Sequence, residues 1–217
     1  LNAVNAVERT APIKSRDYPD DKFVKYTGIA KNNSMRLLRV INNLIDANHL
    51  ENKDYTLDLK YVNLVYELNE LIKSIFELLD SNELELSLTT DLQALDAVID
   101  PYELDRILLN LISNSMKFNE NKPKIQLSLN LDHQMIQLDY SDNSIGIPKT
   151  LVQTAFLKYH QLDTDFAKKS EGAGFGLYLS KQLVELHNGT LSPMYASDRG
   201  GMHYRLEIPT KQPENHG

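Results

Sequence analysis

The stretch from residue 100 to residue 140 constrains the fold most, because it joins a strong helix to two alternating strands. Asp100 is a good helix N-cap, and Pro101 follows it at the first helical position, where proline is favoured. One face of this helix, which ends near Phe118, consists of Leu104, Ile107, Leu108, Leu111, Ile112 and Ser115. Residues 125–131 and 136–140 then alternate between apolar and polar, and a short polar turn separates them. The pattern predicts a helix followed by an antiparallel hairpin with one buried face.

Further elements on both sides of this stretch extend the same unit. They are a possible strand over residues 55–60, a helix over 64–79, and strands over 84–88, 97–99, 190–195 and 202–208. Leu179, Leu183 and Leu186 share one face of another helix, and we expect Gly189 to be its C-terminal cap. The expected fold class is α+β, with a two-layer α/β sandwich in which helices cover one face of a mixed sheet.

The first 54 residues predict a separate helical unit. A truncated helix starts at Leu1, and a second helix repeats small and apolar residues at steps of four and three: Ala30, Ser34, Leu37, Ile41 and Leu44. Two helices cannot bury this seam alone, so a hairpin that pairs with a second copy into a four-helix bundle is favoured. Packing of the seam on the rest of the chain is the alternative. We expect two domains, residues 1–54 and 55–217, and a homodimer.

Composition excludes several classes of protein. The chain has 23 Lys and Arg against 30 Asp and Glu, so its formal charge of -7 gives no general attraction for nucleic acid. The absence of cysteine excludes disulfides, cysteine-bound metals and a thiol nucleophile. No apolar run reaches the roughly 18 residues of a membrane span. We expect a cytoplasmic fragment whose membrane anchor, if the parent protein has one, lies upstream of Leu1.

Three polar side chains form a stripe beside the apolar face of the helix that starts at Asp100. Asn110, Asn114 and Lys117 fall at positions i, i+4 and i+7. Mg²⁺ accepts carboxamide oxygens as ligands, and an ammonium group suits phosphate oxygens. The stripe is therefore suited to a metal-bound nucleotide, although a solvated helix face is the commoner explanation for such a pattern.

Asp142 lies at the end of the second strand of the hairpin. By strand parity it points to the same face as Leu138 and Tyr140, toward the interior. A carboxylate at the mouth of an apolar pocket can accept a hydrogen bond from an exocyclic amine such as that of adenine. The alternative is a plain turn, since Asn143-Ser144 followed by Gly146 is also a turn sequence.

Three glycines at alternate positions, Gly172, Gly174 and Gly176, precede the helix that carries Leu179. Their backbone amides and the helix N-terminus predict an anion site. The spacing differs from the dinucleotide-binding motif G-x-G-x-x-G, and no Lys-Ser or Lys-Thr follows as in a Walker loop. A flexible loop is the alternative.

Together these segments, in this order, resemble the nucleotide-binding domain of sensor histidine kinases. That domain belongs to an ATPase family that also contains type II topoisomerases and the Hsp90 chaperones. Residues 110–118 are similar to its N box, 142–147 to its first glycine box, 156–159 to its F box, and 172–189 to its second glycine box. Residues 1–51 resemble the dimerisation and histidine-phosphotransfer hairpin, so the resemblance covers nearly the whole chain.

The resemblance implies ATP and Mg²⁺ as cofactors. Asn114 would ligate Mg²⁺, Asn110 and Lys117 would meet the phosphates, and Asp142 would bind the adenine amine. The glycines would cradle the phosphates beneath a lid from about residue 160 to residue 171, with Lys168 and Lys169 as lid contacts. The expected nucleotide-binding residues are Asn110, Asn114, Lys117, Phe118, Asp142, Gly146, Ile147, Tyr159, Lys168, Lys169, Gly172, Gly174, Phe175, Gly176 and Leu177.

Some positions depart from the family pattern. Ser144 replaces the first glycine of the adenine-side box, Glu171 replaces a small residue, and Met202-His203 replaces a small hydroxyl pair. These departures favour weaker ATP binding.

The phosphoacceptor is a further departure, because no histidine precedes His49. We expect the acceptor histidine upstream of Leu1, so that no residue of this chain is itself catalytic. His49 is expected to lie on the surface, and His187 is expected to pack beside the glycine-box helix.

The leading interpretation is a protein-histidine kinase core of a two-component sensor. It would transfer the ATP γ-phosphoryl to the upstream histidine, with a response regulator receiver domain as its partner. The alternative is a degenerate nucleotide-binding or scaffold module that dimerises and signals without phosphoryl transfer. An ATPase of the topoisomerase or chaperone type is disfavoured, because those enzymes place a catalytic acid where this chain has Asn110.

Overall fold

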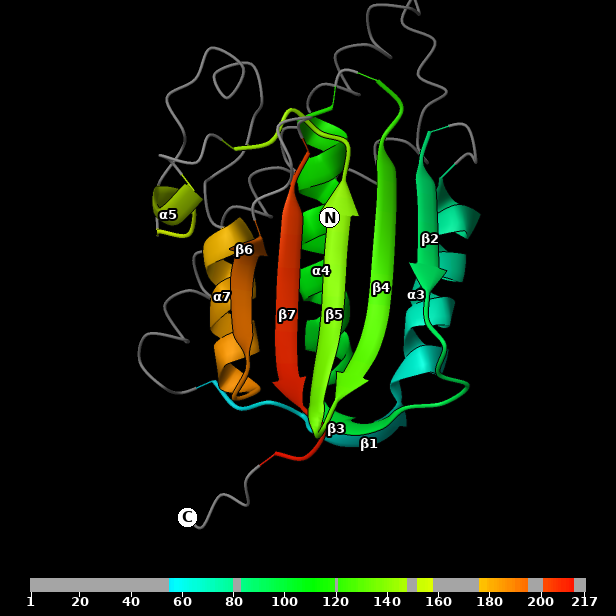
Figure 1. The fold of residues 1–217 in the computed structure, drawn as a ribbon, viewed down its shortest axis with the longest axis vertical. Coiled ribbons are helices and arrows are strands. Elements are labelled where there is room, and N and C mark those ends of the chain that lie inside the picture. The colour runs from blue at the N-terminus through cyan, green and yellow to red at the C-terminus, as the bar shows by residue number, and fades with distance from the viewer. Residues whose placement is uncertain are drawn as a thin grey trace, which may run out of the picture. The chain divides into compact units, whose positions relative to one another are not determined.

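The computed structural model describes residues 55–79, 83–119, 121–147, 152–157, 176–194 and 201–212 (Figure 1). The chain divides into two units, Leu1–Asp46 and Ala47–Gly217, and all described residues belong to the second. The helical hairpin expected over residues 1–54, including His49, and the lid expected over residues 160–171 lie outside the described residues.

The described unit is built on a five-stranded mixed sheet with the strand order β2-β4-β5-β7-β6. Its strands are β2 (Glu85–Thr89), β4 (Lys124–Asp132), β5 (Met135–Asp142), β6 (Thr190–Met194) and β7 (His203–Pro209). Strands β2 and β4 run parallel, whereas the other neighbours run antiparallel. A two-stranded sheet pairs β1 (Lys60–Asn63) with β3 (Asp96–Ile99). The expected fold class, α+β with a mixed sheet, is confirmed.

Three helices lie on one face of the five-stranded sheet: α3 (Leu64–Leu78), α4 (Pro101–Lys117) and α7 (Gly176–Leu186) (Figure 1). A further single turn of helix is α5 (Val152–Ala155). Among the described residues, no helix covers the opposite face of the sheet. None of the described helices combines the length and the apolar character needed to cross a lipid bilayer.

Helix α4 starts where its capping sequence predicts. The Asp100 Oδ1 atom accepts a hydrogen bond from the backbone N–H of Glu103 at 3.2 Å, and Pro101 occupies the first turn. Lys117 in the last turn is favourable next to the negative end of the helix dipole. The predicted helix over residues 100–118 is therefore confirmed within one residue at its C-terminal end.

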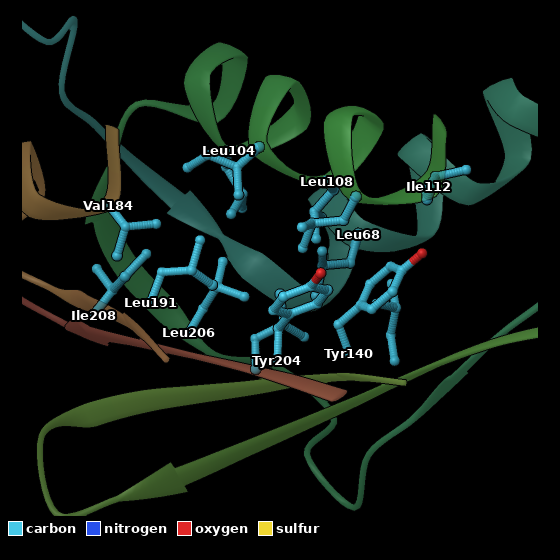
Figure 2. Packing of buried hydrophobic residues seen from close by; sticks show 14 of the residues in the cluster. Leu68, Leu104, Leu108, Ile112, Tyr140, Val184, Leu191, Tyr204, Leu206 and Ile208 are labelled. Carbon is cyan, nitrogen blue, oxygen red and sulfur yellow. The ribbon is translucent and has the colours of Figure 1, made fainter. Parts of the chain in front are cut away.

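The core lies between this helical layer and the sheet (Figure 2). From α4, Ile107, Leu108 and Leu111 are fully buried. Burial of each such side chain contributes about 1.5 to 3 kcal/mol to stability. Figure 2 shows the rings of Tyr140 from β5 and Tyr204 from β7 between the strands and α4. The centroids of these two rings are 6.0 Å apart.

A buried histidine joins the ends of two helices at the edge of this core. His187, which follows α7, is fully buried, and its Nε2 atom accepts a hydrogen bond from the backbone N–H of Asp100 at 3.1 Å. Its Nδ1 atom lies 2.7 Å from the carbonyl oxygen of Leu183 and donates to it. Burial lowers the pKa of His187, which keeps the ring neutral so that Nε2 can accept. The expectation that His187 packs beside the helix is confirmed.

The outer face of the sheet carries polar pairs across its strands. Asp139 on β5 lies opposite Arg205 on β7, and the guanidinium group donates two hydrogen bonds to the carboxylate, at 2.7 and 3.0 Å. Gln137 on β5 pairs in the same way with Glu207 on β7, with 3.2 Å between Nε2 and Oε1. The alternation of buried and polar residues along both strands separates the core from this face.

The prediction of a strand over residues 55–60 is wrong, because the strand found in this region, β1, covers Lys60–Asn63. Tyr55 instead donates its hydroxyl hydrogen bond to the buried carboxylate of Glu103, and the backbone N–H of Asp58 donates to Asp100 Oδ2 at 2.8 Å. These groups bind the start of α4 rather than a neighbouring strand. The apolar pattern alone did not reveal that competition.

The cap of α7 also differs from the expectation. Asn188, and not Gly189, takes the left-handed conformation, with φ 56°. The backbone N–H of Asn188 donates to Glu185 O, and that of Gly189 donates to Val184 O, as in a Schellman motif. Glycine is needed at position 189 for another reason: a Cβ there would lie 2.3 Å from the carbonyl oxygen of Glu207.

Asp105 on α4 provides a pH-dependent test of this packing. Burial, with a smaller effect from the Glu67 carboxylate on α3, raises the pKa of Asp105 from 3.8 to about 6. The folded protein therefore binds more protons than the unfolded chain between these pH values, so this group lowers stability as the pH rises through that range. We expect Asp105→Asn to stabilise the protein at pH 7.5 by about 1 kcal/mol, a value reduced by solvent screening, and not at pH 4.

Urea unfolding of the parent chain and the variant at both pH values measures this difference. The exposed Asp91→Asn is the matched control, which should change stability little at either pH. An equal gain from Asp105→Asn at pH 4 and pH 7.5 would contradict the assigned cause.

Candidate functional site

The first residue of α7 packs against two carboxamide side chains of α4. A Cβ added to Gly176 would lie 3.9 Å from both Cγ and Oδ1 of Asn110 and 3.9 Å from Nδ2 of Asn114. The Asn110 Nδ2 atom also donates to the hydroxyl of Ser180, one turn further along α7, at 3.4 Å. Both asparagines remain partly exposed. The structure thus brings the polar stripe of α4 to the positive end of the α7 dipole.

The end of α4 places the other two expected residues of this helix next to each other. The Lys117 Nζ atom lies 4.8 Å from the centroid of the Phe118 ring, within the range of a cation–π contact. The backbone N–H of Phe118 donates to Asn114 O, and its carbonyl oxygen accepts from the N–H of Ile145. The segment after β5 is thereby held against the end of α4.

Asp142, the last residue of β5, points toward the helical layer, as strand parity predicts. Its Oδ1 atom accepts hydrogen bonds from the backbone N–H groups of Ser144 at 2.9 Å and Met202 at 2.8 Å. Its Oδ2 atom accepts from the hydroxyl of Ser115 on α4. Hydrogen bonds from both sides therefore fix the orientation of this carboxylate.

The turn after Asp142 depends on two glycines. Gly146 and Gly201 have φ values of +75° and +91°, which strain other residues. A Cβ at Gly201 would lie 2.2 Å from the carbonyl oxygen of Asp142, and a Cβ at Gly146 would lie 2.9 Å from that of Gly201. Glycine at these two positions allows the segment before β7 to lie against the end of β5, where the backbone N–H of Gly201 donates to Ser144 O and that of Asp142 donates to Met202 O. The sequence prediction included Gly146 and missed Gly201.

Ser144, which departs from the family pattern, fits this turn without backbone strain. Its φ is not positive, so glycine is not required there. It is buried, and its Oγ atom accepts a hydrogen bond from the backbone N–H of Gly146 at 3.3 Å. Its carbonyl oxygen accepts from the N–H of Gly201 at 2.7 Å. Serine thus contributes a contact that glycine lacks.

Two of the expected site residues, Ile147 and Leu177, are apolar and pack in or against the core. The backbone N–H of Ile147 donates to the sulfur of Met202 at 3.1 Å, and the Ile147 side chain packs against the core. Leu177 is buried in the first turn of α7. The remaining expected residues, Tyr159, Lys168, Lys169, Gly172, Gly174 and Phe175, lie outside the described residues.

Ser115 and Tyr140 also belong to the candidate site, because they connect to Asp142 through hydrogen bonds. The sequence analysis assigned them only to the core. Ser115 is buried with its Oγ atom 2.5 Å from the hydroxyl oxygen of Tyr140. The sequence offered one signal of this role: Ser115 is a hydroxyl residue on a face of α4 that is otherwise apolar. No cluster of three or more His, Cys, Asp or Glu side chains suited to a metal ion occurs within the described ranges.

Comparison with known proteins gives one family match. A sequence profile of the family described as "Histidine kinase-, DNA gyrase B-, and HSP90-like ATPase" matches residues 99–212. This range includes Asn110, Asn114, Asp142 and Gly176. It therefore covers all the described contacts of the candidate site.

Individual proteins agree with this match. The Hybrid signal transduction histidine kinase D of Dictyostelium discoideum is 32% identical over 207 residues, which cover 88% of this chain and 13% of that protein. The crystal structure of full-length ShkA with AMPPNP gives a TM-score of 0.73 at 19% identity, over 87% of this chain and 39% of that chain. Histidine kinase ThkA in complex with response regulator protein TrrA gives a TM-score of 0.69 at 17% identity, over 96% and 57% of the two chains. The two structural likenesses show a shared fold.

Ser144 offers a direct test of the turn. Replacing it with glycine, the residue that the resemblance in the sequence analysis leads one to expect here, should destabilise the protein by about 1 to 2 kcal/mol, because the partly buried N–H of Gly146 loses its acceptor and the unfolded chain gains entropy. Ser144→Ala, which removes only the hydroxyl, should cost about 1 kcal/mol. Urea unfolding of the three proteins measures both effects. A glycine variant more stable than the parent chain would contradict the role given to the hydroxyl.

Proposed function

The chain belongs to the histidine kinase-, DNA gyrase B-, and HSP90-like ATPase family, and we propose that it is the ATP-binding kinase core of a two-component sensor. In this proposal the γ-phosphoryl of ATP is transferred to a histidine outside these 217 residues, since no histidine precedes His49. The 32% identity to a histidine kinase over most of the chain supports the kinase branch of the family.

One observation carries the proposal: consecutive residues of α4 contact the two segments expected to bind opposite ends of a nucleotide. Asn114 lies against Gly176 at the start of α7, whereas Ser115 donates to Asp142 at the end of β5. A single rigid helix therefore sets the distance between a phosphate site and a base site. Phosphoryl transfer depends mainly on such positioning and on charge neutralisation.

The phosphate end of the site follows from the start of α7. Backbone N–H groups at a helix N-terminus attract anions, and Gly176 places this end of α7 next to the α4 carboxamides. We assign the phosphate contacts to Asn110 and Lys117. Lys117 supplies a positive charge in the last turn of α4, the turn that follows Asn114.

The base end of the site follows from Asp142. Its ionised carboxylate is an acceptor, which suits the 6-amino group of adenine and opposes the 6-carbonyl of guanine. Gly146, where a Cβ would lie 2.9 Å from the carbonyl oxygen of Gly201, allows the turn after this carboxylate to pack closely.

The donor chemistry also fits Mg²⁺. The Asn114 oxygen is a neutral hard ligand, and Mg²⁺ in nucleotide sites takes one or two protein ligands together with phosphate oxygens and water. Bound Mg²⁺ would neutralise charge on the phosphates. Asn114 would hold the ion near the C-terminal end of α4, beside Gly176 at the start of α7.

The partners and the domain division belong to the same proposal. We assign residues 1–54 to a dimerisation hairpin and residues 55–217 to the ATP-binding domain, so that the protein acts as a homodimer. A response regulator receiver domain is the proposed partner, because the similar histidine kinase ThkA was crystallised with a response regulator. The proposed reaction takes place in the cytoplasm, where ATP is available.

Nucleotide selectivity tests the two ends of the site separately. Asp142→Ala should weaken ADP binding about ten- to a hundredfold, the equivalent of one charged hydrogen bond, and should leave its Mg²⁺ dependence. Asn114→Ala should do the converse, reducing the Mg²⁺-dependent part of ATP binding with less effect on base selectivity. Calorimetric titrations with ADP, GDP and ATP, with and without Mg²⁺, measure these effects.

The parent chain is the reference in these titrations. Equal affinities for ADP and GDP in the parent chain would remove Asp142 from the base site. No binding of any nucleotide would favour the alternative function, a scaffold that signals without phosphoryl transfer.

Phosphoryl transfer is tested with ATP labelled on the γ-phosphoryl. The 217-residue chain should bind Mg-ATP but should not acquire acid-labile phosphate, because the proposed acceptor histidine lies outside it. A longer form of the protein that includes the acceptor should become labelled. Strong labelling of the 217-residue chain would show that the acceptor lies within it.

A further inference from the structure

A chain of three hydrogen-bonded side chains leads from the core to the Asp142 carboxylate. The Tyr140 hydroxyl lies 2.5 Å from Ser115 Oγ, and Ser115 contacts Asp142 Oδ2. Tyr140 and Ser115 are 0% and 1% exposed, so water does not compete for these bonds. We call these two residues the hydroxyl pair.

The direction of these bonds follows from the available protons. An ionised carboxylate only accepts, so the single Ser115 proton is directed to Asp142 in preference to the neutral Leu111 carbonyl, 3.2 Å away. Burial raises the pKa of Tyr140, so that its hydroxyl keeps its proton. Tyr140 therefore donates to Ser115, and Ser115 donates to Asp142.

The acceptor capacity of the carboxylate is almost used up by these contacts. Each carboxylate oxygen accepts about two hydrogen bonds. Oδ1 already accepts from the backbone N–H groups of Ser144 and Met202, and Oδ2 accepts from Ser115. Within the described residues, one acceptor position therefore remains, on Oδ2.

We propose that Ser115 and Tyr140 are positioning residues that make the site select adenine by leaving Asp142 with a single acceptor position. Adenine presents one amine at its six position, which matches one acceptor. Guanine presents two adjacent donors, N1–H and the 2-amino group, which would match both oxygens of an unrestrained carboxylate. The hydroxyl pair and the two backbone N–H groups prevent that arrangement. The inference rests on the proposed nucleotide site and adds the source of its base selectivity.

Tyr140→Phe is the most conservative test, because it removes one oxygen and keeps the ring in the core. Ser115 then loses its donor and can turn toward Leu111 O. We expect the ratio of ADP affinity to GDP affinity to fall about tenfold, chiefly through stronger GDP binding, because Oδ2 of Asp142 then has a second free acceptor position. Calorimetric titration of the 217-residue chain with ADP and GDP measures this ratio, and circular dichroism melting reports folding.

Tyr204→Phe is the matched control. Tyr204 is a buried tyrosine on the neighbouring strand and its ring packs against that of Tyr140, but the hydroxyl pair and its bond to Asp142 do not include it. This variant should leave the ADP to GDP ratio within about twofold of the parent value.

A double-mutant cycle separates positioning from a general loss of packing. Ser115→Ala should lower the same ratio, and Ser115→Ala combined with Tyr140→Phe should lower it no further, because both changes break one chain of bonds. Ser115→Thr, which keeps the hydroxyl, should restore most of the ratio. Additive losses would instead indicate two independent packing effects and would overturn the proposal.

The outcomes also separate this inference from the proposed function. If the parent chain prefers ADP and Tyr140→Phe folds with an unchanged ratio, the hydroxyl pair has no role in selectivity while the nucleotide site stands. If the parent chain binds neither ADP nor GDP, both proposals fail.

Discussion

The packing of one face of α4 on the five-stranded sheet determines the positions of the other contacts in the described unit. Ile107, Leu108 and Leu111 are fully buried there. Successive residues of an α-helix are 100° apart around its axis, so fixing this face also fixes where the neighbouring side chains point. Asn114 is thereby directed to the start of α7, and Ser115 to Asp142. The hydrophobic core and the polar site therefore share one structural constraint.

Buried polar groups occur at both ends of this helix, and both sets are paired. At its start, Asp100 binds the N–H of Glu103 through Oδ1, and its own N–H donates to the neutral ring of His187. Near its end, the hydroxyl pair reaches Asp142. No buried side-chain nitrogen or oxygen in the described part of the chain lacks a partner. An unpaired buried polar group costs about 1 to 3 kcal/mol. A shift of α4 that broke these contacts would therefore be unfavourable, so they favour one position of the helix.

Local signals predicted the parts of the fold in which the chain follows its own periodicity. The Asp100-Pro101 start and the alternation in β4 and β5 gave a helix and a hairpin in the right places. The strand expected over residues 55–60 was wrong because distant partners, Glu103 and Asp100, bind that segment. For the same reason Ser115 was assigned only to the core: its role depends on two residues of β5 that meet it only in the folded protein. The sequence therefore predicted which side chains have suitable chemistry, but it did not predict which distant segments they contact.

The pleat of β5 has an evolutionary consequence. Asp139 and Tyr140 are adjacent in sequence, yet Asp139 pairs with Arg205 on the outer face while Tyr140 is buried beneath α4. Substitutions at outward positions can therefore alter surface charge and solubility without passing through the core. Inward positions lack this freedom, since a change there alters the packing of the core and the contacts of the hydroxyl pair with Asp142. Divergence among descendants of this chain should accordingly be greater at every second residue of the strand.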